Sequence, residues 1–470
     1  HTKFYRMGKG GLSSAFKIGY DSNFDPYPIN TFEDCSWVKS QEYALHAQAS
    51  NAPLIIKGNV FVDSADAGIY IDRGSSAVQI VNNAVIGVYM SPNAPVATNE
   101  FDSSQRVSNY AGIRADSIPA RMLGNVVSGS NDIGFMHRAE RCPASRIFNN
   151  EVFSTMIGVW VVHNSVSCAT VNLYKIWKAA HIGMFLADVV SGNMKLTHIT
   201  IADSHLGIVP YFSVGSSYRR LWVSDAILIG SSPADKGCQH SNFCRAQLTT
   251  DPYHANCNSI FAPANIRRIG YVAPFNTNFK QTCEFSLDYR ICRQASPAYI
   301  DFDCAFPAEV HEHFDKGMGW AVFKRTTFAY WKNDDCGRTS RALSMSVSGP
   351  EISFPASFEQ STWHLSDNAS RFELSAWKLD PAFVRRKTPC KSTNGGCMGL
   401  DQALFQDLDG TLLGLNAENQ SSVLPLSPRT QNVWTSQCTT TLGSQEVDAL
   451  ICPNVKVQLL EMKNIDRGAK

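Results

Sequence analysis

Pairs of carboxylates are the feature of this chain that comes nearest to catalytic chemistry. A glycosidase that works through two acids needs their carboxyl groups roughly 5 to 9.5 Å apart across a cleft. Asp63 and Asp66 are close in sequence, while Asp203 and Asp225 are 22 residues apart, about one period of the chain's glycine repeat. Either pair could line an outer face of the fold. Because solvated surface acids are common, we expect neither pair to be catalytic.

Metal-ligating residue types are present without a complete site. His311-Glu312-His313 would place both imidazoles on one face of a strand, but no third ligand can be named. Cys238 and Cys244 lack the spacing of a zinc knuckle. Residues 407–410, Asp-Leu-Asp-Gly, resemble the start of a calcium loop but lack its later acidic ligands, which favours a turn. We therefore predict no metal site, no cofactor and no catalytic residue.

Cysteine usage favours an oxidising compartment. The chain has 14 cysteines, and nine of them fall between residues 238 and 397 in sequence typical of loops. An even number clustered in this way predicts disulfides, although their connectivity cannot be deduced. The sequons Asn368-Ala369-Ser370 and Asn419-Gln420-Ser421 predict glycosylation at Asn368 and Asn419. Together these features predict an extracellular or cell-surface protein.

Charge and hydropathy exclude several classes of partner. The 42 basic and 41 acidic residues give a net charge of +1 without a basic stripe, so a nucleic-acid partner is not expected. The longest apolar run, 156–162, is far shorter than the roughly 20 residues that span a bilayer. We expect no transmembrane segment in this chain. Its start at His1, without Met or a signal peptide, suggests a piece of a larger protein.

A repeat in the first half carries the strongest structural signal. A glycine followed by an apolar residue recurs, and from Gly87 the steps are 25, 22, 24, 25 and 24 residues. The series consists of Gly68, Gly87, Gly112, Gly134, Gly158, Gly183 and Gly207. A second series, about nine residues earlier in several units, consists of Asn59, Asn83, Asn125 and Asn150. A period in the low twenties is typical of few folds.

One coil of a parallel β-helix explains both series. Successive coils stack about 4.8 Å apart, so equivalent residues form columns. Glycine at a corner supplies backbone freedom and lets the next coil approach, whereas asparagine tolerates the left-handed conformation and can bond to its neighbours in the stack. Leucine-rich repeats have a similar period but need a Leu-x-x-Leu-x-Leu frame that is missing here. An antiparallel sandwich with accidental spacing is the remaining alternative.

Several segments resemble the ectodomains of fibrocystin and fibrocystin-L, the polycystic kidney and hepatic disease family. Ala111-Gly112-Ile113, Asn125-Val126-Val127 and Gly134-Phe135 are similar to that family's β-helix coils, and 225–230 is similar to the close of the helix. Residues 406–414 resemble the family's Asp-Leu-Asp-Gly-Ser signature, and stretches within 452–467 fit the segment that comes after this signature in the family. The matches keep the family's order and cover the chain in patches.

The resemblance implies a large secreted or membrane-anchored surface protein, with cilia as one location. It also implies that the chain begins just after a small glycine-rich domain, named G8. One related branch consists of cell-surface hyaluronidases, in which a Tyr-Pro-Ile-His-Phe-His strand looks important. Here residues 27–32 read Tyr-Pro-Ile-Asn-Thr-Phe, so both histidines are absent. This departure argues against hydrolysis.

The predicted fold is all-β: a right-handed parallel β-helix with disulfide-tied loop insertions and a β-rich C-terminal segment. We divide the chain into β-helix repeats (1–230), a cysteine-rich irregular insertion (231–319), further β-helix coils (320–374) and a β-rich segment with the Asp-Leu-Asp-Gly run (375–470). The predicted function is a non-enzymatic structural, adhesive or receptor-like ectodomain segment. Its expected partners are extracellular glycans, proteins or further copies of itself. The alternative is a polysaccharide-acting enzyme related to the hyaluronidases, a hypothesis by analogy of fold.

Overall fold

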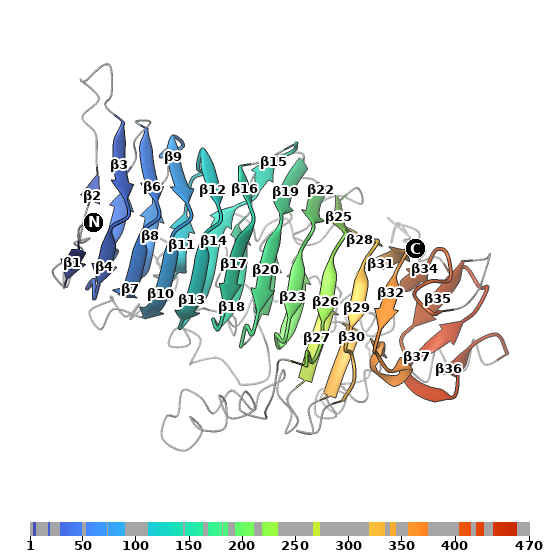
Figure 1. Ribbon diagram of the computed structural model, residues 1–470. Coiled ribbons are helices and arrows are strands. Elements are labelled where there is room, and N and C mark those ends of the chain that lie inside the picture. Colours follow the sequence, from blue (N-terminus) through green and yellow to red (C-terminus); the bar gives the residue numbers. More distant parts are fainter. Residues whose placement is uncertain are drawn as a thin grey trace, which may run out of the picture.

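Three faces of short parallel strands stack coil upon coil along one axis in the computed structural model (Figure 1). The chain passes through each face in turn, so neighbouring strands of a sheet come from successive coils. This arrangement is a parallel β-helix, and the predicted fold is confirmed. The structure describes residues 3–5, 17–18, 29–48, 53–72, 74–89, 111–143, 146–162, 168–180, 182–186, 193–210, 219–233, 267–272, 319–333, 339–344, 356–374, 404–414, 420–426 and 436–457.

The first face, sheet A, runs through eleven coils. Its strands are β1 (Lys3–Tyr5), β4 (Ser36–Val38), β7 (Val60–Ala65), β10 (Ala84–Tyr89), β13 (Val126–Ser130), β17 (Asn150–Phe153), β20 (Tyr174–Trp177), β23 (Thr200–Ala202), β26 (Ile227–Ile229), β29 (Thr327–Ala329) and β32 (Thr362–His364). All neighbours in this sheet are parallel.

The second face, sheet B, follows sheet A around each coil. Its strands are β2 (Lys17–Ile18), β5 (Leu45–Ala47), β8 (Ala67–Ile71), β11 (Ala111–Ala115), β14 (Ile133–Arg138), β18 (Ile157–Val162), β21 (Ile182–Leu186), β24 (Leu206–Pro210), β27 (Arg267–Val272), β30 (Thr339–Ser344) and β33 (Phe372–Glu373).

The third face consists of sheet C in the early coils and sheet D in the later ones. Sheet C contains β3 (Asn30–Glu33), β6 (Leu54–Lys57), β9 (Val78–Val81), β12 (Arg121–Leu123) and β16 (Ile147–Phe148). Sheet D contains β19 (Cys168–Asn172), β22 (Asn193–Thr197), β25 (Arg219–Ser224), β28 (Gly319–Lys324), β31 (Ala356–Glu359) and β34 (Phe405–Asp407). Near the change-over, β15 (Glu140–Arg141) pairs with β19 in the antiparallel sense.

The glycine repeat forms one column of sheet B, as predicted. The residues on either side of each glycine pair in register with those of the next coil, from Gly112 through Gly134, Gly158 and Gly183 to Gly207. These glycines have no positive φ, so close approach is what requires them. A Cβ at Gly134 would lie 2.6 Å from the carbonyl oxygen of the next glycine and 2.2 Å from a Val152 methyl group.

Gly87 does not belong to this column. It lies in β10 of sheet A with a φ of +72°, and its missing Cβ leaves room for the Asp63 carboxylate. The register shows instead that Gly68 precedes Gly112 in the column, although 44 residues separate them. The step of 25 residues from Gly87 was therefore a coincidence of spacing.

The asparagine series forms a hydrogen-bonded ladder at the entry to sheet A. The backbone N–H and the side-chain Nδ2 of Asn59 both donate to Oδ1 of Asn83 at 3.0 Å. Asn83 repeats both bonds to Asn125 at 3.0 Å. Asn125 repeats them to Asn150 at 3.1 and 3.0 Å. Each rung is almost completely buried, so the ladder satisfies groups that water cannot reach.

The left-handed position lies one residue before the ladder, not in it. Ten residues stacked at this corner have φ between +52° and +67°. They are Asp34, Gly58, Asn82, Gly124, Asn149, Leu173, His198, Asp225, Arg325 and Gln360. The first five are glycine, asparagine or aspartate, which tolerate this conformation. Leu173, Arg325 and Gln360 adopt it as well, although their residue types disfavour it. Stacking of the coils therefore imposes the conformation where local preference does not.

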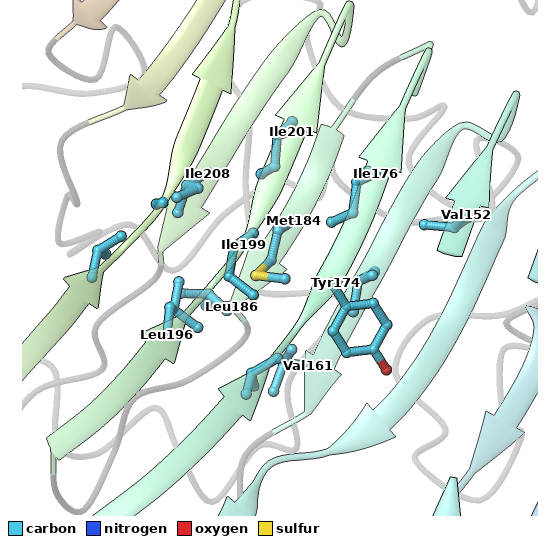
Figure 2. Packing of buried hydrophobic residues seen from close by; sticks show 14 of the residues in the cluster. Val152, Val161, Tyr174, Ile176, Met184, Leu186, Leu196, Ile199, Ile201 and Ile208 are labelled. Carbon is cyan, nitrogen blue, oxygen red and sulfur yellow. The ribbon is translucent and has the colours of Figure 1, made fainter. Parts of the chain in front are cut away.

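Apolar columns fill the interior. Figure 2 shows Val152, Ile176 and Ile201 on successive strands of sheet A, with Val161 and Leu186 on neighbouring strands of sheet B. All five are buried, and they belong to one continuous core cluster that extends from Trp37 to Ile451. Alternation along each strand produces these columns, because every second side chain points inward.

A buried pair of polar side chains, His137 and Tyr174, lies among these apolar columns. Tyr174 takes the position in sheet A that asparagine holds in the preceding coils, and its hydroxyl lies 2.9 Å from Nε2 of His137. The rings of the two residues are stacked, and Nδ1 of His137 lies 2.9 Å from the carbonyl oxygen of Arg138. Burial lowers the pKa of His137 to about 4 and raises that of Tyr174 well above its ordinary value.

The last coil is closed by an antiparallel hairpin. β35 (Ser421–Leu424) pairs with β34 and with β37 (Gln445–Cys452), and β36 (Thr439–Leu442) pairs with β37. A 3-10 helix, Asn368–Ser370, packs beside this hairpin, which lies at the C-terminal end of the rod in Figure 1. Covering the open strands of the final coil removes an edge that could pair with another chain.

The domain boundaries differ from those expected in two places. β27, at Arg267–Val272, pairs with β24 and β30 in sheet B, so this part of the 231–319 range belongs to the β-helix. β34 continues sheet D by pairing with β31, so the helix also extends into the 375–470 range. β28, which begins at Gly319, and β29 continue the stack of coils in sheets D and A. Within the described ranges no helix is long and apolar enough to cross a membrane.

Candidate functional site

Six side chains of the early coils form the candidate site, which we call the Tyr70 cluster. His46, Tyr70 and Arg114 occupy equivalent positions on β5, β8 and β11 of sheet B, one coil apart. They point outward, because Ile69 and Ile71 on either side of Tyr70 belong to the core. The remaining members are Tyr43, Asp72 and Asp116.

Aromatic rings form the body of the cluster. The ring centroids of Tyr43 and Tyr70 are 4.7 Å apart, and those of His46 and Tyr70 are 4.6 Å apart in a stacked arrangement. The Arg114 guanidinium lies over the Tyr70 ring, 5.0 Å from the ring centre. Such cation–π and stacking contacts hold the rings in one orientation.

Two carboxylates from adjacent coils border the rings. Asp72 and Asp116 follow β8 and β11, and the Tyr70 hydroxyl donates to Asp116 at 3.0 Å and to Asp72 at 3.3 Å. Arg114 makes a two-point ion pair with Asp116 at 3.1 and 3.2 Å. Nε2 of His46 lies 3.8 Å from Asp72. The two acids are thus held around a single hydroxyl.

Burial and the pairing of Arg114 with Asp116 set the pKa shifts within the cluster. Burial raises the pKa of both Tyr43 and Tyr70, so both phenols are neutral donors at physiological pH. Burial opposes the charge of Arg114, but the hydrogen-bonded Asp116 outweighs it and raises the pKa of the guanidinium. The two phenols and the guanidinium therefore act as hydrogen-bond donors in this cluster.

Access to the cluster is through its polar edge. Tyr70 is only 4% exposed, whereas the side chains of Asp72 and Asp116 are 24% and 15% exposed. A molecule that approaches this face meets carboxylate oxygens and the edges of rings. Carboxylates that accept hydrogen bonds beside aromatic carbon are suited to polyhydroxylated ligands.

Asp203 and Asp225, one of the two acid pairs considered from the sequence, lie at opposite ends of sheet A strands. Asp203 follows β23, whereas Asp225 precedes β26 on the next coil. Asp203 is buried, pairs with Arg268 at 3.2 Å and accepts two hydrogen bonds from Ser232. Asp225 pairs with Arg325 at 2.6 and 2.8 Å, and this bond lowers its pKa. Each carboxylate is therefore paired with an arginine of its own, and the two do not form one acid pair.

Asp63 and Asp66, the other pair, lie close to the passage from sheet A to sheet B, Asp63 within β7 and Asp66 between β7 and β8. Both have positive φ, of 54° and 64°. The Asp63 carboxylate packs against Gly87 of the next coil. Burial raises the pKa of the Tyr89 phenol, and the negative charges of Asp63 and Asp66 raise it further. The left-handed backbone conformation, which aspartate tolerates, thus explains both residues.

Asp407 is the last residue of β34, and residues 408–410 bend into a turn at 411–414, so the predicted turn follows the Asp-Leu-Asp-Gly run. The buried Asp407 accepts backbone hydrogen bonds from Leu412 and Leu413 at 3.3 and 2.9 Å. Asp409 accepts from Thr411 and from the backbone of Gln360 on the neighbouring coil. The carboxylate oxygens thus stabilise the last coil. Within the described residues no three His, Cys, Asp or Glu side chains are grouped to hold a metal ion, and residues 311–313 lie outside those ranges.

Two disulfides are present among the described cysteines. Cys142 pairs with Cys168 beside the β15–β19 pairing, and Cys438 pairs with Cys452 across the terminal hairpin. Cys35 is a free thiol. Cys238, Cys244 and the other cysteines of the predicted insertion lie outside the described residues.

Of the two predicted glycosylation sites, Asn368 lies in the 3-10 helix beside the terminal hairpin. The side-chain nitrogen of Asn368 donates a hydrogen bond to the carbonyl of Leu442 at 3.2 Å, and Ser370 of the same sequon is buried. A glycan on Asn368 would require this nitrogen to turn away from the hairpin. Asn419 lies outside the described residues.

Sequence reasoning missed the Tyr70 cluster, although a signal was present. Residues 67–72 read Ala-Gly-Ile-Tyr-Ile-Asp and residues 111–116 read Ala-Gly-Ile-Arg-Ala-Asp. The shared frame places Tyr70 over Arg114 and Asp72 over Asp116 once the glycines are aligned. Comparisons with protein-family models and with curated proteins find no match to this chain.

Proposed function

We propose that this chain is a non-enzymatic segment of an extracellular surface glycoprotein, and that its β-helix binds glycan chains at the Tyr70 cluster. The observation that supports the proposal is the convergence of rings, a guanidinium and two carboxylates on the outward side of three successive coils. A stack of coils is rigid, so the groups are pre-organised for a ligand at little entropic cost.

The chemistry of the cluster favours sugars over other ligands. Asp72 and Asp116 supply acceptors for hydroxyl groups, and the Arg114 ion pair keeps one of them in place. The Tyr43 and His46 rings supply apolar surface beside those acceptors. A sugar ring has hydroxyls along its edge and C–H groups on its faces, so it can use both kinds of surface.

The setting of the protein is proposed from its disulfides and its resemblance. Disulfides persist in oxidising compartments, so Cys142–Cys168 and Cys438–Cys452 support an extracellular location. The fibrocystin-like segments support a surface protein of the structural, adhesive or receptor-like kind, with the ciliary membrane as one setting. The parallel β-helix agrees with this resemblance, although many unrelated functions share that architecture.

An enzyme that cleaves polysaccharides is the second candidate, and one observation favours it. Because Asp72 and Asp116 both bind the Tyr70 hydroxyl, their nearest oxygens are at most about 6 Å apart, within the range of a glycosidase acid pair. We rank it second for two reasons. The hydroxyl occupies the space between the acids, and Asp116 is already paired with Arg114.

Incubation with hyaluronan and chondroitin sulfate separates the two functions. Binding measured by calorimetry, with polymer length unchanged by size-exclusion chromatography, supports a binding module. Shortening of either polymer would overturn the non-enzymatic proposal. Asp72→Asn should weaken glycan binding at least tenfold, about 1.4 kcal/mol, because it removes an acceptor charge from the accessible edge.

The matched control is Asp34→Asn, which removes an exposed carboxylate from a corner of the same early coils. Asparagine tolerates the left-handed conformation at residue 34, so this variant should fold and bind like the parent. If neither polymer binds, or if the two substitutions weaken binding equally, the Tyr70 cluster is not the glycan site.

A further inference from the structure

Exposed apolar side chains of the described chain gather on the outward face of sheet A. Two outward residues per strand, from β4 to β32, make up this face. They are Ser36, Val38, Val60, Val62, Ala84, Ile86, Val126, Ser128, Glu151, Phe153, Lys175, Trp177, Thr200, Ala202, Ile227, Ile229, Thr327, Ala329, Thr362 and His364. We call this set the sheet A face.

Large apolar side chains are concentrated on this face. Six large apolar residues of the described chain are well exposed, and three of them, Val60, Ile86 and Ile227, belong to the sheet A face at 38%, 47% and 40% exposure. Two more, Leu173 and Leu365, lie at its two borders, next to β20 and β32. Exposed apolar side chains on the outward side of a parallel sheet mark a contact surface, since parallel sheets are normally covered on both sides.

Charge is confined to the middle of the face. Glu151 and Lys175 are the only Asp, Glu, Lys or Arg residues among its 20 positions, and they are paired neighbours on β17 and β20. Beside them the Phe153 and Trp177 rings are stacked at 4.3 Å, and Nε1 of Trp177 donates to Glu151 at 3.0 Å. Glu151 and Lys175 thus occupy adjacent coils at the centre of the face, and Lys178, which follows β20, places its ammonium 5.8 Å from the centre of the Trp177 ring.

We propose that a second copy of this chain docks on the sheet A face, related by a two-fold axis that lies along the strand direction between β17 and β20. This axis places Glu151 of each copy opposite Lys175 of the other. It also places Ala84 opposite Ile227, so a small side chain faces a large exposed one. A face that is complementary to itself in this way is the requirement for a closed dimer.

The charges select this axis over the other in-plane choice. A two-fold axis parallel to the solenoid axis would place each outward residue opposite the other outward residue of the same strand in the second copy. Glu151 would then face Phe153, and Lys175 would face Trp177, so both charges would lose water without gaining a partner. The strand-parallel axis pairs them instead, which fixes both register and orientation.

The area of the face is sufficient for a weak dimer. The strands from β4 to β32 span nine coil spacings of about 4.8 Å, and a width of about 15 Å between corners gives about 600 Å² on each copy. About 1,200 Å² in total lies at the low end of specific interfaces, and we expect a weak, reversible dimer. The proposal is independent of glycan binding, which uses sheet B.

Sedimentation velocity from 1 µM to 500 µM tests the proposal with the folded chain. The parent should shift from monomer to dimer across this range. Glu151→Lys should weaken the dimer at least tenfold, because two lysines then face each other, and Lys175→Glu should do the same. The double exchange, Glu151→Lys with Lys175→Glu, restores opposite charges and should return the constant to within about threefold of the parent.

The control is Lys195→Glu, an equal charge change at an exposed residue on β22 of sheet D, which should leave the dimer unchanged. Circular dichroism of each variant shows whether it is folded, and Ile227→Asp provides a second disruption that does not alter the Glu151–Trp177 bond. A parent that stays monomeric at 500 µM would overturn the proposal. So would a dimer that the single exchanges do not weaken, or one that the double exchange does not restore.

Discussion

Replacing Asn125 by alanine is the perturbation that probes the asparagine ladder most directly. The Asn125 side chain accepts from the backbone N–H and Nδ2 of Asn83, and it donates to the carbonyl of Ile80 at 2.9 Å. After truncation the Nδ2 of Asn83 keeps its bond to Ile56, but the buried N–H of Asn83 loses its partner. The variant therefore orphans at least one group that water cannot reach.

The number of orphaned groups sets the size of the effect. An orphaned buried group costs about 1–3 kcal/mol, and the unfilled volume of the amide adds to it. We expect a loss of about 2–4 kcal/mol in the free energy of unfolding. Because each coil contacts only its neighbours, the loss should be greatest in the coils that contain β9, β10 and β13.

Two measurements check this prediction. Guanidinium unfolding should show a lower midpoint, and hydrogen exchange should accelerate for residues 78–89 while residues 321–329 keep their protection. The matched control is Asn82→Gly, which removes an exposed amide one residue before the ladder and keeps a backbone with positive φ. Equal effects of the two substitutions, or uniform acceleration along the rod, would refute the reasoning.

Two further changes test the packing of the interior. Gly134→Ala should destabilise by more than about 2 kcal/mol, because its Cβ would lie 2.6 Å from a backbone oxygen of the next coil; a midpoint within error of the parent would contradict this. For His137, burial lowers the folded pKa to about 4, so the unfolded chain takes up the proton first. Stability should therefore fall by about 3 kcal/mol from pH 6.5 to 4, and His137→Gln should remove that part of the slope in unfolding titrations.

The columns could be predicted from the sequence because they depend on local period. Gly112 and Gly134 are 22 residues apart with no insertion between them, so spacing alone aligns them. Two reasons for glycine were expected, backbone freedom and close approach of the next coil. The structure confirms the close approach, but these glycines have no positive φ, so backbone freedom is not what requires them.

The Tyr70 cluster could not be found by spacing, because Tyr70 and Arg114 are separated by 44 residues yet lie on adjacent coils. A long connection within one coil hides such neighbours until the register is known. The same reason explains why the sequence did not predict the burial of Asp203. Its partner Arg268 is 65 residues away and arrives only when β27 joins sheet B.

Distances between spin labels on one outward column of sheet A test the stacking of coils most directly. Val60, Lys175, Ile227 and Thr362 share this column and are exposed. Pulsed electron resonance from residue 60 at low protein concentration should give backbone separations of about 19, 29 and 38 Å, rising by about 4.8 Å per coil. Distances that follow the number of intervening residues instead, or that do not rise from one label to the next, would contradict a single stack.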